Sequence, residues 1–203
     1  MKQPPEFYGQ PARTVAQALL GQRLVRLQPD GQLVSGLIVE TEAYCDHPTE
    51  LDLACHGDRA NNGRPTARSA VMFGPAGHAY VYFTYGMHWM FNIVTGQTGQ
   101  ANAVLVRALE PVAGIEQMMA RRKRPFSQLT NGPAKLAQAL AIDKSLNGAN
   151  LCTPQSVIWV EPAQPLPASQ IDQGPRIGLG QTPEPWYSMP WRYWIKENKF
   201  VSK

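Results

Sequence analysis

A long strand pattern spans residues 33–44, with the sequence LVSGLIVETEAY. Successive residues of a β-strand point to opposite faces of the sheet. Alternation therefore predicts one face formed by Ile38, Glu40, Glu42 and Tyr44. It predicts an opposite face formed by Leu37, Val39, Thr41 and Ala43. Two carboxylates beside an aromatic ring, within an otherwise apolar strand, require an explanation.

Two interpretations of Glu40 and Glu42 stay open at this point. The simpler one is that both line a strand edge exposed to solvent. The chemical one is that one of them activates a water molecule, since residues i and i+2 of a strand lie about 6.6 Å apart. That spacing is close to the carboxylate separation of inverting glycosidases. It indicates hydrolysis of a glycosidic bond, but names neither the acting carboxylate nor the substrate.

The rest of the chain predicts a single α+β domain. Its 203 residues are 43% hydrophobic and 17% charged, which is typical of one globular domain. Strand patterns are expected at residues 23–27, 33–44, 78–84, 88–94 and 103–109, and helical spacing at 112–122 and 133–141. The proline-rich residues 162–175 predict a surface loop, and residues 176–200 a strand-like return to the core. This mixture favours an antiparallel or mixed sheet with flanking helices.

The charged residues and the cysteines limit the class of protein. The net charge is +4, and residues 121–124 are four consecutive cations, which is compatible with a polyanionic partner. An odd number of cysteines and an N-terminus without an apolar stretch predict a protein that is not secreted. The spacing of Cys45, His47, Cys55 and His56 matches no regular zinc motif, so no metal is expected.

Residues 78–92, HAYVYFTYGMHWMFN, carry an unusual number of aromatic side chains. Aromatic strands usually belong to a hydrophobic core, but two positions do not fit that interpretation. Tyr85 lies where the strand should turn, which is a poor place to bury a large ring. Asn92 interrupts an apolar strand, and a buried amide there would require a hydrogen-bond partner. The residues between Cys45 and Ala70 form a long polar segment of the kind that often carries function.

In order and spacing, a series of motifs resembles the alkyladenine (3-methyladenine) DNA glycosylase family along nearly the whole chain. The motifs are Val39–Tyr44, Ala54–His56, Arg64–Thr66, Met72–Phe73, Tyr80–Tyr82, Tyr85–Met87, Asn92, Leu105–Pro111, Gly132–Leu136 and Arg176–Gly178. The resemblance implies one compact domain over residues 1–203, with a curved antiparallel sheet flanked by helices and a β-hairpin that inserts into DNA. It further implies a monofunctional enzyme of base excision repair.

The resemblance also implies the role of each site residue. Glu42 corresponds to the glutamate that activates water, while Arg107 and the backbone carbonyl of Ile177 correspond to groups that hold this water. Glu40 accompanies Glu42 without a catalytic role. The flipped base would be enclosed by Tyr44, His56 and Tyr82. Asn92 would disfavour normal guanine, and Tyr85 would fill the space that the base vacates in the duplex.

The expected partner is double-stranded DNA containing damaged purines, and the resemblance implies a monomer that needs no cofactor, metal or membrane. The expected location is the cytoplasm and nucleoid of a bacterium, or the nucleus of a eukaryote.

Two alternative functions are a hydrolase of free nucleosides and a non-catalytic binder of damaged DNA. A nucleoside hydrolase would not explain an aromatic residue, Tyr85, at a turn. A non-catalytic binder would not explain the combination of Glu42 with Arg107. A lyase would need an amine nucleophile, for which Lys135 is the only lysine inside the motifs.

Overall fold

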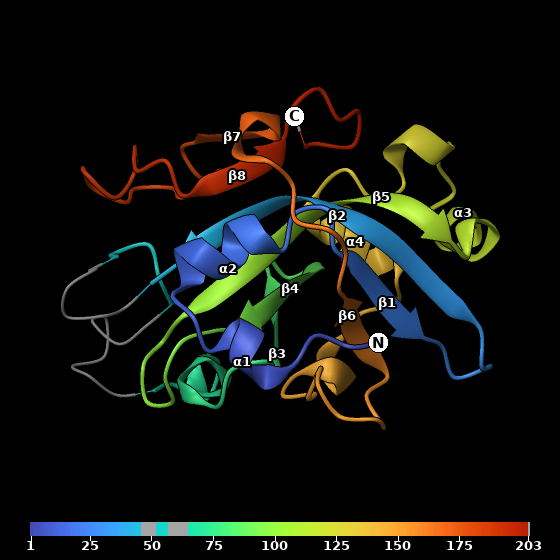
Figure 1. Ribbon diagram of the computed structural model, residues 1–203, viewed down its shortest axis with the longest axis horizontal. Helices are drawn as coiled ribbons and strands as arrows, with labels where there is room; N and C mark the ends of the chain where they lie inside the picture. The colour runs from blue at the N-terminus through green and yellow to red at the C-terminus, as the bar shows by residue number, and fades with distance from the viewer. Residues whose placement is uncertain (46–51, 57–64, 203) are drawn as a thin grey trace.

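A computed structural model describes residues 1–45, 52–56 and 65–202 of the chain (Figure 1). His47, Arg64 and most of the polar segment after Cys45 lie outside the described residues. The strands are β1 (Arg23–Leu27), β2 (Leu33–Tyr44), β3 (Ala79–Thr84), β4 (His88–Val94), β5 (Ala103–Ala113), β6 (Ile158–Glu161), β7 (Ile171–Gly174) and β8 (Arg192–Ile195). The α-helices are α1 (Pro5–Tyr8), α2 (Ala12–Ala18), α3 (Ile115–Arg122) and α4 (Pro133–Ala139). Short 3₁₀ helices lie at Ala70–Phe73, Phe126–Gln128, Lys144–Leu146 and Ala168–Gln170.

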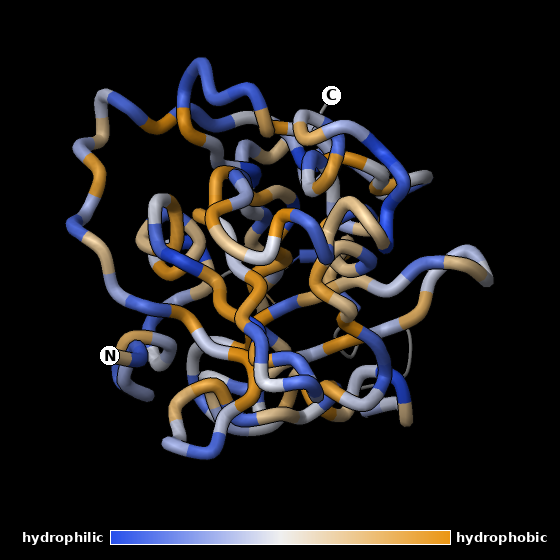
Figure 2. The backbone as a smooth tube through the Cα atoms, turned by 90° about the vertical axis from the view of Figure 1, so that its right-hand side faces the viewer, coloured by the Kyte–Doolittle hydropathy of each residue, from blue (hydrophilic) through white to orange (hydrophobic). Residues whose placement is uncertain are grey.

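The described strands form one curved sheet in the order β3-β4-β5-β2-β1-β6, and β8 pairs with both β2 and β7. Every pair among them is antiparallel, so the predicted α+β fold is confirmed in its antiparallel form. The long strands β2 and β5 arch across the molecule, with α2 on one side and the β7–β8 pair on the other (Figure 1). Apolar segments concentrate in the interior of this arrangement (Figure 2).

Strand β2 is central because three other strands pair with it. Its pairing with β5 shifts register between Ser35 and Gly36, between Ile38 and Glu40, and between Glu40 and Thr41. Each extra residue at a bulge interrupts the period of two. Ile38 consequently packs into the main core together with Ala43, on the face opposite to the one predicted.

Val39 is the second position at which simple alternation is wrong. Its side chain packs in a separate small cluster with Ala108 and Phe200, away from the main core that contains Ala43. Beyond the bulges the alternation returns. Thr41 donates a hydrogen bond to the carbonyl of Ala16 in α2, so this residue faces the helix while Glu42 faces away.

Two further expectations for secondary structure differ from the structure. Val112 was expected to begin a helix, but it continues β5, and α3 starts only after Gly114 takes a left-handed φ of 71°. A side chain at Gly114 would collide with Val34 and the Leu33 carbonyl, which explains why glycine makes this turn. The proline-rich segment ends in β7 and is not loop throughout, because β8 offers it a partner. Within the described residues, no helix is long and apolar enough to cross a membrane.

Candidate active site

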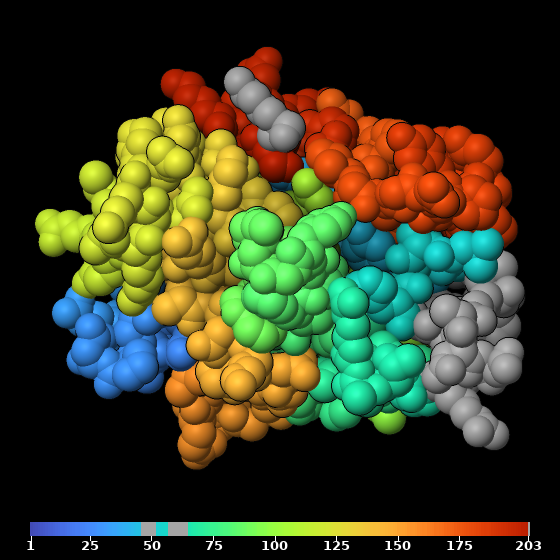
Figure 3. All heavy atoms as spheres, turned by 180° about the vertical axis from the view of Figure 1, so that it is seen from behind, coloured from blue at the N-terminus to red at the C-terminus, as the bar shows by residue number. Residues whose placement is uncertain are grey.

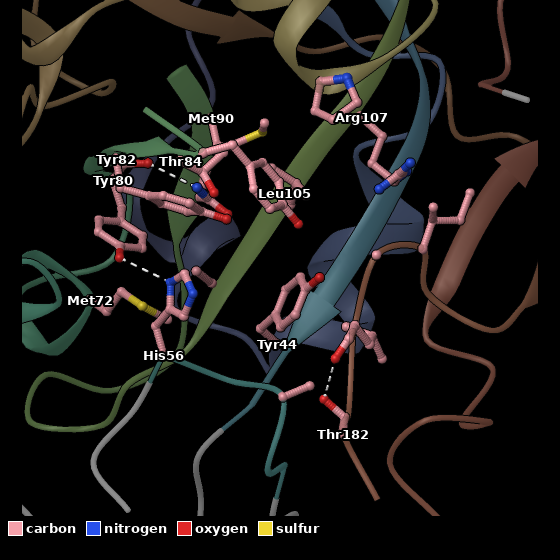
Figure 4. A pocket seen from close by; sticks show the side chains of 18 residues that line it. Tyr44, His56, Met72, Tyr80, Tyr82, Thr84, Met90, Leu105, Arg107 and Thr182 are labelled. Carbon is pink, nitrogen blue, oxygen red and sulfur yellow. Dashed lines mark hydrogen bonds between the residues drawn. The ribbon is translucent and has the colours of Figure 1, made fainter. Parts of the chain in front are cut away.

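A pocket of about 360 Å³ opens where the ends of β2, β3 and β4 meet the segment that follows Gly174. The hairpin between β3 and β4, the residues after 65 and the segment after 175 gather on one face of the molecule (Figure 3). In the pocket, Tyr44 lies on one side, while His56, Tyr80 and Tyr82 lie on the other (Figure 4). A concave site of this volume, with aromatic walls and a few convergent polar groups, fits a small flat ligand.

Glu42 lies beneath this pocket and is fully buried. Its Oε1 accepts a hydrogen bond of 2.7 Å from the backbone amide of Ile177 and forms a 3.1 Å ion pair with Arg107. Its Oε2 accepts a 2.9 Å hydrogen bond from the hydroxyl of Tyr44. Because a carboxylate has about four acceptor positions, these three donors leave capacity for one more. The interpretation of Glu42 as part of a solvent-exposed edge is wrong.

Arg107, in the neighbouring strand β5, is shared by two carboxylates. Its Nε donates to Glu40 at 2.8 Å, while its Nη1 lies 3.1 Å from Glu42. Burial by itself lowers the pKa of Arg107, but the charges of Glu42 and Glu40 outweigh this effect and raise it. Glu40 is fully buried and also bonds Arg192 and Ser202. Glu40 therefore orients Arg107 from the side away from Glu42.

Tyr44 connects the carboxylate to the pocket wall. Burial raises the pKa of Tyr44 well above its ordinary value, and the charge of Glu42 raises it further. The phenol therefore stays protonated and donates its hydrogen bond to Glu42. The guanidinium of Arg176 lies 4.7 Å from the centroid of the Tyr44 ring, and Arg176 is itself held by Asp52.

His56 and two tyrosines form the opposite wall. The His56 ring packs edge-to-face on Tyr82 at 4.8 Å, and its Nδ1 lies 3.3 Å from the Tyr80 hydroxyl. Burial of the imidazole, together with the charge of Arg68, lowers the pKa of His56 to about 4. Although part of the residue is exposed at the pocket mouth, its ring is therefore neutral at physiological pH. Burial also raises the pKa of Tyr82 to about 12, so this wall is uncharged.

Asn92 and Tyr85 are the two residues that did not fit a simple core strand in the sequence. Both line the pocket in the structure. Asn92 is buried in the pocket, and its amide donates a 3.0 Å hydrogen bond to the Tyr80 carbonyl, which supplies the partner that a buried amide requires. Tyr85 is 78% exposed at the tip of the β3–β4 hairpin. Tyr85 and Gly86 both have positive φ angles, of 52° and 68°, as a tight hairpin turn requires. The turn thus directs a large ring outward beside the pocket mouth.

The structure brings the expected site residues together. Seven of the eight line the pocket, namely Tyr44, His56, Tyr82, Tyr85, Asn92, Arg107 and Ile177, and Glu42 contacts three of these. The contact that the structure gives between Ile177 and Glu42 is through the amide N–H. Sequence reasoning gave no site role to Asp52 and Ser202, since nothing in their local sequence shows what the fold brings next to them. Tyr80 belongs to the Tyr80–Tyr82 motif, but only the structure shows that it lines the pocket beside His56.

The four consecutive cations at residues 121–124 do not all face outward as a DNA-binding patch. Arg121 donates to the Ala139 carbonyl and to Gln28, and Arg122 donates to the Leu129 carbonyl. Arg122 also donates to the side chain of Gln138 in α4, so these two arginines join α3 to α4. The start of β2 pairs with the end of β5 that leads into α3, so the cations lie at the opposite end of β2 from Tyr44.

Comparison with known proteins gives the class of protein that this fold and site define. A family model described as methylpurine-DNA glycosylase matches residues 6–199. A protein of Carboxydothermus hydrogenoformans is 46% identical over 98% of both chains, and one of Myxococcus xanthus is 45% identical over 98% of this chain and 93% of its own. One of Chlorobaculum parvum is 43% identical over 97% of this chain and 88% of its own. All three carry the name "Putative 3-methyladenine DNA glycosylase".

The class is that of DNA-repair glycosylases, which are hydrolases of the N-glycosidic bond. Within it, the chain belongs to the methylpurine-DNA glycosylase family. The resemblance stated from the sequence motifs is confirmed.

Proposed function

We propose that this enzyme takes a damaged purine nucleotide out of duplex DNA into the aromatic pocket and hydrolyses its N-glycosidic bond with a water activated by Glu42. The observation that carries the proposal is the position of the Glu42 carboxylate. It is fixed by Tyr44, Ile177 and Arg107 directly behind a pocket with aromatic walls. A general base must be held within hydrogen-bond reach of the proton that it removes.

The chemistry follows from the arrangement of these groups. Water attacks C1′ of the sugar, its proton passes to the Glu42 carboxylate, and the C1′–N bond breaks with its electron pair going to the leaving purine. A purine alkylated at N3 or N7 carries a positive charge, so it leaves as a neutral base without further protonation. General-base assistance of this kind is typically worth about 10²–10⁴-fold in rate. Arg107 and the backbone at Ile177 would position the water, and the products are a free base and an abasic site.

The pocket walls explain why an extruded purine would stay there. Extrusion costs a few kcal/mol, while stacking on aromatic rings offers roughly 1–3 kcal/mol per base. Tyr44 supplies one wall, and His56 with Tyr82 supplies the other. The neutral state of His56 avoids repulsion of a cationic base. Asn92, which also lines the pocket, would disfavour the exocyclic amino group of guanine.

The hairpin supports the same function. Tyr85 is exposed at its tip, so its ring can enter the space left in the duplex, as side-chain wedges do when they unstack base steps.

We further propose that the enzyme is a monofunctional monomer without lyase activity. The ammonium of Lys135 is held by the carbonyl and side chain of Asn131, which suits a structural role better than attack on a sugar.

The test is an excision assay on duplexes that carry one 3-methyladenine, 7-methylguanine, hypoxanthine or ethenoadenine, with an undamaged duplex as the control. Release of free base from at least one lesion duplex is expected, together with alkali-labile abasic sites and no covalent adduct after borohydride treatment. Turnover of free nucleosides without excision from DNA would favour a nucleoside hydrolase. Tight binding of lesion DNA without any base release would favour a non-catalytic binder, and a borohydride-trapped adduct would favour a lyase.

A further inference from the structure

Tyr44 is contacted by a buried cation that the proposed reaction does not use. The guanidinium of Arg176 lies 4.7 Å from the centroid of the Tyr44 ring and 5.0 Å from that of Trp191, so it packs against both aromatic rings. A ring offers two faces to its surroundings. Because Tyr44 also lines the pocket, a stacked base would meet the face that Arg176 leaves free.

Arg176 is paired with a carboxylate that is equally buried. Its Nη1 and Nη2 donate to the two oxygens of Asp52 at 2.5 and 2.8 Å, and both side chains are 0% exposed. Burial alone lowers the pKa of Arg176, but the hydrogen bonds and charge of Asp52 outweigh it and raise the pKa. Asp52 also accepts hydrogen bonds from the amides of Cys45 and Ala54, which fix its carboxylate beside the cation.

We propose that the Asp52–Arg176 pair sets the preference of the pocket between cationic and neutral damaged purines, an inference that rests on the proposed function. Without Asp52, the positive charge of Arg176 would oppose a cationic base on the far face of Tyr44. The two like charges would lie roughly 8 Å apart, since van der Waals stacking adds about 3.5 Å beyond the ring. Asp52 cancels this repulsion, and a neutral base does not experience it.

The size of the effect follows from Coulomb's law. At an effective dielectric constant of about 20, two unit charges roughly 8 Å apart change an equilibrium constant by about thirtyfold. The other cations near the pocket are expected to repel a stacked cationic base less strongly than an unpaired Arg176 would. Arg107 is shared by Glu40 and Glu42, and Arg68, which lies 4.7 Å from the Tyr82 ring centroid, is exposed and therefore screened by water.

The experiment compares Asp52→Asn with the uncharged double variant Asp52→Asn/Arg176→Gln. For each protein, single-turnover excision is measured for 7-methylguanine, a cation, and for hypoxanthine, a neutral base, in the same duplex sequence. The ratio of the two rates is then formed within each protein, so that a general loss of activity cancels. In Asp52→Asn the ratio of cationic to neutral excision is expected to fall on the order of tenfold or more. In the double variant it is expected to return to within about threefold of the wild-type ratio, since no net charge remains behind Tyr44.

A ratio that is unchanged in Asp52→Asn, or equally reduced in both variants, would overturn the proposal, because a purely structural role makes no distinction by charge. If Asp52→Asn does not fold, Asp52→Ser provides the same charge state with a smaller side chain. Failure of the wild-type enzyme to release a base from any of the four lesion duplexes would instead refute the proposed function, and it would be seen before any variant is made.

Discussion

The imidazole of His56 forms part of the pocket wall that we propose holds the extruded base. Its pKa is lowered to about 4 because the tyrosine wall shields much of the ring from water and because the charge of Arg68 lies nearby. A histidine with a lowered pKa is protonated only as the pH falls toward this value, so His56 stays neutral above about pH 5. It can therefore stack on a cationic purine without repelling it.

The pH dependence of excision should show no titration of His56. Between pH 5.5 and 8.5, the logarithm of the single-turnover rate against pH is expected to have the same shape for wild type and His56→Gln, while the absolute rate is lower in the variant. A limb with an apparent pKa near 6.5 that is present in wild type and lost in His56→Gln would contradict this assignment.

At the scale of single residues, the strand pattern predicted part of the site from local sequence. Alternation correctly grouped Glu40, Glu42 and Tyr44, because the extra residue within β2 precedes all three of them. The register shift between Glu40 and Thr41 comes from an extra residue in β5, so it leaves the period of two in β2 unchanged. It could not predict that Arg107 joins the two glutamates, since that contact depends on the pairing of β2 with β5. The Asp52–Arg176 pair spans 124 residues of chain and has no local signal.

At the scale of elements, the β3–β4 hairpin is the part of the fold that we propose presents a side chain to DNA. The cross-strand pair Phe83 and Trp89, with ring centroids 4.6 Å apart, packs near its tip and supports the turn. Tyr85 thus lies on a short, well-supported hairpin, which suits insertion into a duplex.

Tyr85→Ser is expected to reduce both lesion affinity and single-turnover excision, because the extruded state loses the group that fills the gap in the duplex. The arrangement around Glu42 should stay intact, so excision from single-stranded lesion DNA should change much less. Tyr187→Ser, at a half-exposed tyrosine outside the pocket, is the matched control. Unchanged affinity and excision on duplex DNA would show that Tyr85 is not the wedge.

The strands of this fold are more predictable than its helices and its C-terminal region. Strands at 23–27, 33–44 and 88–94 agree with their predicted bounds because apolar runs and turn residues delimit them. The helix expected from residue 112 starts at Ile115, since the pairing of β5 with β2 overrides the helical spacing of Val112. The strands β7 and β8 are four residues each and form through their pairing with each other and with β2, which local sequence does not show.

At the scale of the whole molecule, the C-terminal end of the chain closes over the buried charges of the site. Ser202 donates to Glu40 from its backbone amide at 2.7 Å and from its hydroxyl at 2.8 Å, and it accepts from Arg107 at 3.1 Å. Glu40 and Arg107 come from β2 and β5, so this contact joins the last residues to the centre of the sheet. Its hydrogen bonds satisfy charges that would otherwise be costly to bury.

Ser202→Ala is expected to lower the free energy of unfolding by about 1–3 kcal/mol, because it removes a hydroxyl that bonds two buried charged groups. Denaturant unfolding measures this change, and Ser188→Ala, at an exposed serine, is the control. Equal stabilities of Ser202→Ala and wild type would mean that the C-terminal contact contributes little to the fold.

The most direct test of the central claim is the single-turnover excision rate of Glu42→Gln on a lesion duplex, measured together with its lesion affinity. Glutamine keeps the size of the side chain but cannot take a proton from water. The expected result is lesion affinity close to that of wild type with excision reduced by about 10²–10⁴-fold. Excision at a rate near wild type would contradict the role of Glu42 as the general base.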